Sequence, residues 1–135
     1  MSQENVEIVR RGLDAFNRRD LDAWLAEWDA RGEYRPAMER DMAGDDDSFR
    51  GHAGLRRWWQ EMADAWSYLH VDVHEIRPIA DRVLTSVTLR GKGRVSGAEM
   101  EAPFCQVGTI RGGKISSSRD YAEREQALEA LGLSE

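Results

Sequence analysis

The hydrophobic pattern of this chain changes period about halfway along its length, and this change limits the folds it can adopt. In the first half, apolar side chains recur at three- and four-residue steps, the spacing of one face of an α-helix. From about Tyr68 onward, apolar and β-branched residues alternate, which is typical of β-strands. Helices followed by strands indicate an α+β fold in which the helices pack on one face of a sheet.

The first half predicts three helices, and Asp20 is placed to cap the second. Their apolar stripes are Val6, Val9, Leu13 and Phe16; Leu21, Trp24, Leu25 and Trp28; and, from about Gly51, Leu55, Trp58, Trp59, Met62 and Trp66. Between the second and third helices, Glu33–Met38 is predicted to be a brief strand, and Pro36 confines it to an edge or a bulge.

The second half predicts four strands in a meander, followed by a C-terminal helix. Three strands cover Tyr68–Ile79, Arg82–Arg90 and about Glu99–Ile110. The fourth follows Gly112-Gly113 and carries Asp120 close to its end. A strongly curved sheet covered by three helices would enclose a conical cavity, and concave, mostly apolar sites of this kind bind small molecules.

Length and charge narrow the classes of function. The 135 residues are expected to form one domain, residues 1–135. A net charge of −6 argues against nucleic acid and anionic membranes as partners. No apolar run approaches the roughly 20 residues needed to span a bilayer, and the first residues lack a secretion pattern, so a cytoplasmic location is expected. Cys105 is the only cysteine and is expected to be a buried small hydrophobe.

Four segments of the chain resemble the SnoaL-like branch of the nuclear transport factor 2 superfamily, and the similarity extends over essentially the whole chain. They are Glu4–Trp24, Phe49–Trp59, Asp81–Leu84 and Gly113–Ile115. The resemblance implies a cystatin-like cone, with a curved antiparallel sheet covered by three N-terminal helices, plus a C-terminal helix. It also implies a homodimer through the open face of the sheet. The superfamily includes isomerases, cyclases, epoxide hydrolases and non-enzymatic binders, so the resemblance leaves the function open.

The outer face of the predicted sheet is mixed in character, which agrees with a homodimer. It is expected to include Val107, Thr109, Ile115 and Ser117.

Asp120 is the leading candidate for a functional residue, and its direction depends on the last hairpin. A type I turn with Gly113 in the left-handed position, followed by a bulge, would place Ser116, Ser118 and Asp120 on the same face as Phe104 and Gln106. A two-residue Gly-Gly turn would instead pair Asp120 with Cys105. We prefer the bulged register because it matches how related folds present these strands. On an apolar wall the pKa of Asp120 would be raised, which suits a general acid or base.

Two enzyme patterns of the superfamily match only in part. Arg119-Asp120-Tyr121 resembles limonene epoxide hydrolase, whose aspartate helps to activate a water, and Asp120 also falls where SnoaL-like polyketide cyclases place an acid/base aspartate. The second aspartate and the arginine of the epoxide hydrolases would fall near Val87 and Leu89, which cannot polarise an epoxide. The base and the helix tyrosine of ketosteroid isomerase would fall near Pro36 and Gly12.

Other polar clusters are assigned structural roles. His70, Asp72 and His74 share one strand face, but no third metal ligand is apparent, so this face is expected to be solvated or to face a partner subunit. His52 can cap the third helix or reach the cavity mouth, and capping is favoured. Asp45–Asp47 lacks the spacing of a calcium loop. Neither a metal nor a cofactor is predicted.

Together these observations predict a pocket whose ligand contacts come from both halves of the chain. The candidates are Tyr34, Met38, Trp58, Trp59, Met62, Phe104, Gln106, Ser118 and Asp120. Trp58 and Trp59 point about 100° apart, so at most one should line the cavity.

Three functions remain open at this point. The first is a small-molecule-binding protein for an apolar, polyketide- or terpenoid-like ligand. The second is an acid/base enzyme of the cyclase, isomerase or epoxide hydrolase type that uses Asp120. The third is a dimerisation or partner-binding module, which would have a filled cone.

Overall fold

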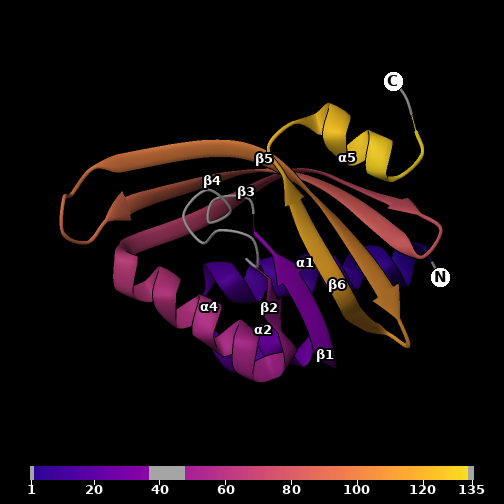
Figure 1. The fold of residues 1–135 in the computed structure, drawn as a ribbon, viewed down its shortest axis with the longest axis horizontal. Helices are drawn as coiled ribbons and strands as arrows, with labels where there is room; N and C mark the ends of the chain where they lie inside the picture. Colours follow the sequence, from indigo (N-terminus) through magenta and orange to yellow (C-terminus); the bar gives the residue numbers. More distant parts are fainter. Residues whose placement is uncertain (1, 37–47, 134–135) are drawn as a thin grey trace.

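The computed structural model describes residues 2–36 and 48–133, and it confirms the α+β fold and the order of helices before strands (Figure 1). The elements are α1 (Ser2–Asn17), α2 (Leu21–Ala26), β1 (Trp28–Arg35), β2 (Phe49–Arg50), α4 (Gly51–Ala65), β3 (Trp66–Ile79), β4 (Arg82–Gly93), β5 (Glu99–Arg111), β6 (Lys114–Tyr121) and α5 (Arg124–Ala130). Helices α1, α2 and α4 lie against one face of the curved sheet, and α5 lies on the opposite face (Figure 1).

The sheet is not wholly antiparallel, which corrects the prediction. Its strand order is β2-β1-β6-β5-β4-β3, and β1 runs parallel to β6, with Tyr34 opposite Ser118. Because β1 and β6 are far apart in the chain, the local hydrophobic pattern does not indicate that they pair. The two-residue strand β2, which pairs Phe49 with Tyr34, is too short to produce a periodic signal.

Two tryptophans assigned to helical stripes belong to strands instead. The carboxylate of Asp20 accepts a hydrogen bond from the Ala23 backbone N–H at 3.1 Å, so the predicted cap of α2 is confirmed. However, α2 ends at Ala26, and Trp28 is the first residue of β1. Similarly, Trp66 begins β3. In both cases a step of four residues continued the helical pattern beyond the end of the helix.

The hairpin between β5 and β6 has the preferred register but reaches it by a different route. Gly112 and Gly113 form a two-residue loop with φ of +58° and +76°, as in a type I′ turn. The extra residue is Ser116, which has no opposite residue in β5. This bulge places Gln106 opposite Asp120. The prediction of a bulged register is therefore confirmed, while the predicted position of the bulge at Gly113 is wrong.

Apolar side chains form two cores, one on each face of the sheet. The larger lies between the three helices and the inner face. The smaller joins α5 to the outer face and contains Leu84, Cys105, Val107, Ala127, Leu128 and Leu131. Cys105 is buried there and faces away from the larger core, as predicted.

The outer face differs from its prediction at two positions. Ile115 belongs to the inner core, because the bulge at Ser116 changes the alternation of β6. Val107 does lie on the outer face, but α5 covers it. The predicted homodimer through this face stays a prediction.

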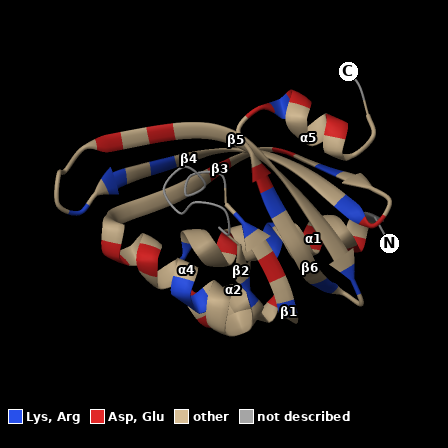
Figure 2. Cartoon of the chain, in the orientation of Figure 1, with Lys and Arg blue, Asp and Glu red and all other residues tan. Residues whose placement is uncertain are grey.

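Acidic and basic residues are interspersed over the helices and strands (Figure 2). Within the described part of the chain, no helix combines the length and the apolar character needed to cross a membrane.

Candidate functional site

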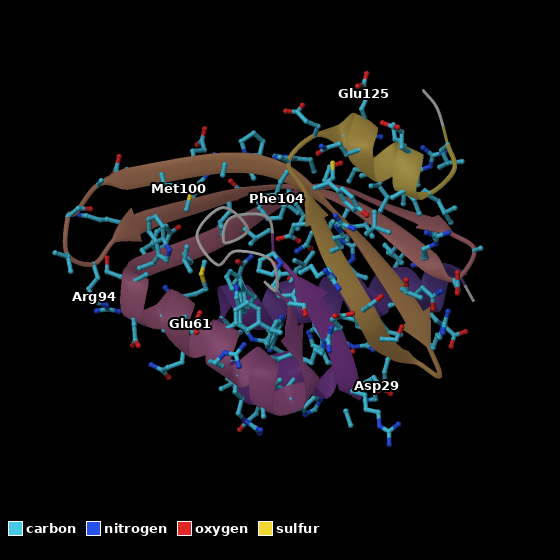
Figure 3. The ribbon with its side chains drawn as sticks, viewed as in Figure 1. Asp29, Glu61, Arg94, Met100, Phe104 and Glu125 are labelled. Carbon is cyan, nitrogen blue, oxygen red and sulfur yellow. The ribbon has the colours of Figure 1, made fainter. Side chains whose placement is uncertain are left out.

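A cavity of about 90 Å³ lies between the helical layer and the inner face of the sheet, where side chains from both layers converge (Figure 3). Its apolar wall includes Leu13 and Phe16 of α1, Trp58 and Met62 of α4, and Phe104 of β5. The described residues that line it include no charged side chain. The cavity is therefore an apolar space with few polar atoms on its wall.

The polar side of the cavity is a hydrogen-bonded network centred on Asp120. The Tyr34 hydroxyl donates to Asp120 Oδ2 at 2.7 Å, and Gln106 Nε2 donates to Asp120 Oδ1 at 2.9 Å. Asp120 is only 4% exposed. Tyr34 and Gln106 line the cavity, whereas Asp120 is not among its lining residues. The carboxylate thus lies behind the two side chains and orients both of them.

Strand pairing explains why these three residues meet. The bulge at Ser116 sets Asp120 directly opposite Gln106 of β5. On the other side of β6, Tyr34 of β1 is opposite Ser118, which is two residues before Asp120. Residues two apart on a strand share a face, so Ser118 and Asp120 point to the same side of the sheet. Their opposite residues, Tyr34 and Gln106, point to that side as well. A single inserted residue therefore decides whether the network forms.

An aromatic cluster from α1, α2, α4 and β1 forms one side of the site. The Trp58 ring meets the Tyr34 ring edge to face, with centroids 5.0 Å apart at 86°, and stacks on Trp24 at 5.5 Å. Trp28 packs against both Trp24 and Tyr34, at 5.6 and 6.0 Å. Trp24, Trp28, Tyr34 and Trp58 all line the cavity. Trp59 instead packs on Phe16 and Trp24 and is not a lining residue.

Two of these tryptophans carry a polar atom that has no hydrogen-bond partner in the described part of the chain. The indole Nε1 atoms of Trp28 and Trp58 are buried, and neither has a hydrogen-bond acceptor among the described residues. The whole side chains are 5% and 6% exposed, respectively. Both unpaired donors belong to residues of the cavity wall.

Two glycines on the cavity wall border open space. A Cβ atom at Gly12, in the middle of α1, would meet no atom within 4 Å. A Cβ at Gly108 of β5 would meet only the Ser117 carbonyl oxygen, at 3.8 Å. Glycine in the interior of a helix costs roughly 0.5–1 kcal/mol relative to alanine. The absence of side chains at these positions keeps the cavity larger than it would otherwise be.

The structure brings most of the candidate residues together. Tyr34, Trp58, Met62, Phe104, Gln106 and Ser118 line the cavity, and Asp120 lies directly behind it. Trp59 is outside the lining set. Met38 lies outside the described residues, as does the Asp45–Asp47 segment.

Sequence reasoning missed several wall residues. Trp28 was missed because its four-residue spacing from Trp24 fits a helix, and it was assigned to a helical stripe. Thr85 could have been found, because it shares strand parity with Val87 and Leu89, and it lines the cavity together with Leu89. The helical stripe of α1 was interpreted as core only, although Val9, Leu13 and Phe16 also face the cavity.

The histidines have structural roles. His70 Nε2 lies 3.3 Å from Asp72 Oδ1, and Arg90 donates to the same carboxylate, which raises the pKa of Arg90 above its usual value. His74 pairs with Thr88 at 2.7 Å. No group of three possible metal ligands occurs among the described residues.

The predicted capping role of His52 is wrong. The N-cap of α4 is Arg50, and His52 Nε2 lies 3.1 Å from the carbonyl oxygen of Trp28. Because β2 pairs antiparallel with β1 directly before α4 begins, His52 meets the β1 backbone rather than the first turn of its own helix.

Comparison with known proteins agrees with this architecture. The family described as "SnoaL-like domain" matches residues 9–118 of the chain. A search of proteins with curated descriptions found no significant match.

Among solved structures, an NTF2-like protein of unknown function from Burkholderia pseudomallei K96243 is similar, with a TM-score of 0.80 and 19% identity over 95% of this chain and 97% of that one. TerC, co-crystallised with polyporic acid, has a TM-score of 0.79 and 19% identity over 96% and 98% of the two chains. A protein described as a SnoaL-like polyketide cyclase from Jannaschia sp. CCS1 has a TM-score of 0.76 and 16% identity over 99% and 95%. At these identities the likeness establishes the fold alone.

Proposed function

Because this chain belongs to the SnoaL-like domain family, we propose that it binds a small organic molecule in the cavity between its helices and the inner face of its sheet. The observation that carries the proposal is the buried Tyr34–Asp120–Gln106 network beside an otherwise apolar space. Ligand sites in proteins combine a mostly apolar wall with a few fixed polar groups, and this cavity has that composition. TerC, co-crystallised with polyporic acid, and the protein described as a SnoaL-like polyketide cyclase have the same fold and support a small organic ligand.

In this proposal Tyr34 and Gln106 contact the ligand, and Asp120 is a positioning residue. A buried carboxylate is costly unless it is hydrogen-bonded, and here both oxygens of Asp120 accept hydrogen bonds, from Tyr34 and Gln106. By accepting from Gln106 Nε2, Asp120 fixes which way the amide points. By accepting from the Tyr34 hydroxyl, it fixes the direction of that hydroxyl beside the cavity.

The size of the cavity limits the ligand. Sites for drug-sized molecules measure about 300–1,000 Å³, and an engineered apolar cavity of about 150 Å³ takes up benzene. At about 90 Å³, this cavity is smaller than that one, so a single six-membered ring enters only with a small movement of the wall side chains. A multi-ring polyketide or terpenoid would require a larger movement.

A second candidate function is acid/base catalysis through Tyr34 and Asp120. The hydrogen bond between them is short, at 2.7 Å, and would keep the Tyr34 hydroxyl in place while Tyr34 exchanges a proton with a ligand. A single acid/base pair supplies about 10²–10⁴-fold in rate. Hydrolysis of the limonene epoxide type is not supported, since Leu89 occupies the wall where a polarising charge would be needed.

The proposal is tested by filling the cavity from Gly12. Gly12→Leu adds an apolar side chain that begins in open space at its Cβ atom, whereas Gly12→Ala adds only one methyl group there. We expect methylenecyclohexane, a small apolar ring, to shift the NMR methyl signals of Leu13 and Leu89 in the wild-type protein. Gly12→Leu should weaken this binding at least tenfold, with a smaller loss in Gly12→Ala.

If Gly12→Leu is folded and binds the probe as well as the wild type, the cavity is not the binding site. Turnover of a probe that depends on Asp120 would favour the acid/base function over simple binding.

A further inference from the structure

Two neighbouring oxygen atoms on the cavity wall have no hydrogen-bond partner among the described residues. They are the hydroxyl oxygen of Thr85 in β4 and the side-chain carbonyl oxygen of Gln106 in β5. Both residues line the cavity, and Thr85 is only 2% exposed. Folded proteins pair the large majority of their buried polar side-chain atoms. Unpaired oxygens at a binding cavity therefore indicate where a ligand is recognised.

Both oxygens are open to water-sized molecules. In the described part of the chain, the unpaired polar atoms that are closed off from water within buried and half-buried side chains are the indole nitrogens of Trp28 and Trp58. Thr85 Oγ1 and Gln106 Oε1 do not belong to that group, so each retains accessible surface. Because Thr85 is almost wholly buried and lines the cavity, the accessible surface of its hydroxyl faces the cavity.

The two side chains are direct neighbours on the inner face of the sheet. Thr85 is opposite Gln106 in the register of β4 with β5, and opposite residues of an antiparallel pair have Cβ atoms about 4.5–5.5 Å apart. An O–H···O hydrogen bond measures about 2.7 Å, so the two partners of one hydroxyl group lie up to about 5.5 Å apart. The spacing of Thr85 and Gln106 therefore suits a single ligand hydroxyl between them.

The hydrogen bond to Asp120 determines which atom of Gln106 is left for the ligand. A carboxylate only accepts hydrogen bonds, so the amide turns Nε2 toward Asp120 in β6, on the opposite side of β5 from Thr85. Nitrogen and oxygen branch from the same carbon, so Oε1 points away from Asp120. Oε1 can only accept, whereas the Thr85 hydroxyl can donate and accept. The wall thus presents an acceptor beside a hydroxyl group.

A hydroxyl group on the ligand satisfies both oxygens at once. It donates its proton to Gln106 Oε1 and accepts the proton of the Thr85 hydroxyl. A ketone can accept from Thr85 only, and its oxygen would meet the Gln106 carbonyl oxygen with no proton between them. A protonated amine would bring a charge into a space in which no described lining residue is charged, which costs far more than burying a neutral polar group.

Resting on the proposed binding function of the cavity, we infer that Thr85 and Gln106 together bind a neutral hydroxyl group, so that the ligand is a small cyclic alcohol or phenol. Asp120 acts through Gln106 by setting the direction of its amide. The rings of Trp58 and Phe104 line the same cavity and contact the hydrocarbon part of the ligand.

Three probes of nearly equal size distinguish the kinds of polar group: cyclohexanol, cyclohexanone and the apolar methylenecyclohexane. We expect cyclohexanol to move the ¹³C signal of the Gln106 side-chain carbonyl downfield, as hydrogen bonding to a carbonyl does, whereas the other two probes do not. Thr85→Val should weaken cyclohexanol binding about tenfold, the effect of one hydrogen bond. Binding of methylenecyclohexane should change little in this variant.

Thr109→Val is the matched control, because it makes the same change on the outer face of β5, opposite Ser117 and away from the cavity. It should alter the binding of no probe. Thr85→Val should also raise the melting temperature of the ligand-free protein, since an apolar group of the same shape replaces an unpaired buried hydroxyl. A large fall in the melting temperature would show that this hydroxyl is paired within the fold and would overturn its role in recognition.

The results also distinguish the hydroxyl site from the proposed function. If methylenecyclohexane binds in the cavity but cyclohexanol leaves the Gln106 carbonyl signal in place, the hydroxyl site is wrong and the apolar binding site stands. Equal losses of both probes in Thr85→Val, or tighter binding of cyclohexanone or cyclohexylamine than of cyclohexanol, lead to the same conclusion. If no probe binds, the proposed function is itself wrong. The carbonyl signal of the wild-type protein decides this even where Thr85→Val does not fold.

Discussion

At the scale of single residues, Asp120 shows how burial and hydrogen bonding together define the role of a carboxylate. Its two oxygens are engaged by the neutral donors Tyr34 and Gln106, and it lies behind the cavity wall. Hydrogen bonds to a charged group contribute about 1.5–3 kcal/mol each, so the network stabilises the fold as well as the site. This favours a positioning role for Asp120 over direct contact with the ligand.

A double-mutant cycle measures this network. Tyr34→Phe removes one donor and should lower the free energy of unfolding by about 1–3 kcal/mol, because it leaves a buried carboxylate oxygen less satisfied. Asp120→Asn keeps the shape but changes the acceptor. In urea unfolding, the double variant should be more stable than the sum of the single effects predicts, with a coupling of about 1–2 kcal/mol. Additive effects would mean that the 2.7 Å contact contributes nothing of its own.

Gly32 provides a second prediction at this scale. Gly32→Ala would place a Cβ atom 2.8 Å from Trp28 Cε3 and must therefore displace the indole or the backbone. Such overpacking costs about 1–3 kcal/mol. We expect a lower melting temperature and a shifted Trp28 indole signal. Gly12→Ala is the matched control, since its new methyl group meets open space and should stabilise α1 by roughly 0.5–1 kcal/mol.

At the scale of elements, the β5–β6 hairpin is decisive. Its two-residue glycine loop joins β5 and β6 as an antiparallel pair. The bulge at Ser116 then shifts the register so that Asp120 lies opposite Gln106. The loop alone would place Asp120 opposite Cys105, and the bulge shifts the register by one residue. Without the bulge, a two-residue loop would direct Asp120 toward the outer face, away from Tyr34.

The left-handed backbone conformation of the loop can be tested by substitution. Gly112 has a φ of +58°, which asparagine tolerates and valine does not. Gly112→Asn should leave the free energy of unfolding within about 0.5 kcal/mol, because Asn-Gly is favoured in type I′ turns. Gly112→Val should destabilise by roughly 1–2 kcal/mol, the cost of a left-handed conformation. Equal stability of the two variants in chemical denaturation would contradict the assigned turn.

At the scale of the whole molecule, the sheet separates two cores with different tasks. The inner core contains the cavity, and the outer one anchors α5 over Cys105 and Val107. A seven-residue helix has little stability of its own. Its docking therefore depends on the apolar contacts of Ala127, Leu128 and Leu131 with the outer face.

Cys105 can report on this docking, since its thiol is buried beneath α5. Leu128→Ala removes a fully packed side chain and should cost about 2–5 kcal/mol. The rate at which a thiol reagent labels Cys105 should rise markedly in this variant, because α5 detaches more often. Glu125→Ala, an exposed position on the same helix, should label like the wild type. Rapid labelling of the wild-type protein would show that α5 does not protect the thiol.

The sequence by itself determined the α+β class, the order of the elements and the cap at Asp20, because each of these depends on local periodicity or turn chemistry. It left two registers open for the last hairpin, and the bulge at Ser116 decided that Asp120 pairs with Gln106. It could not determine where the helical stripes end, and so it missed Trp28. The parallel pairing of β1 with β6, the position of the bulge and the covering of the outer face by α5 were decided only by the tertiary structure. Each depends on a contact between segments far apart in the chain, and such contacts leave no mark on the spacing of neighbouring residues.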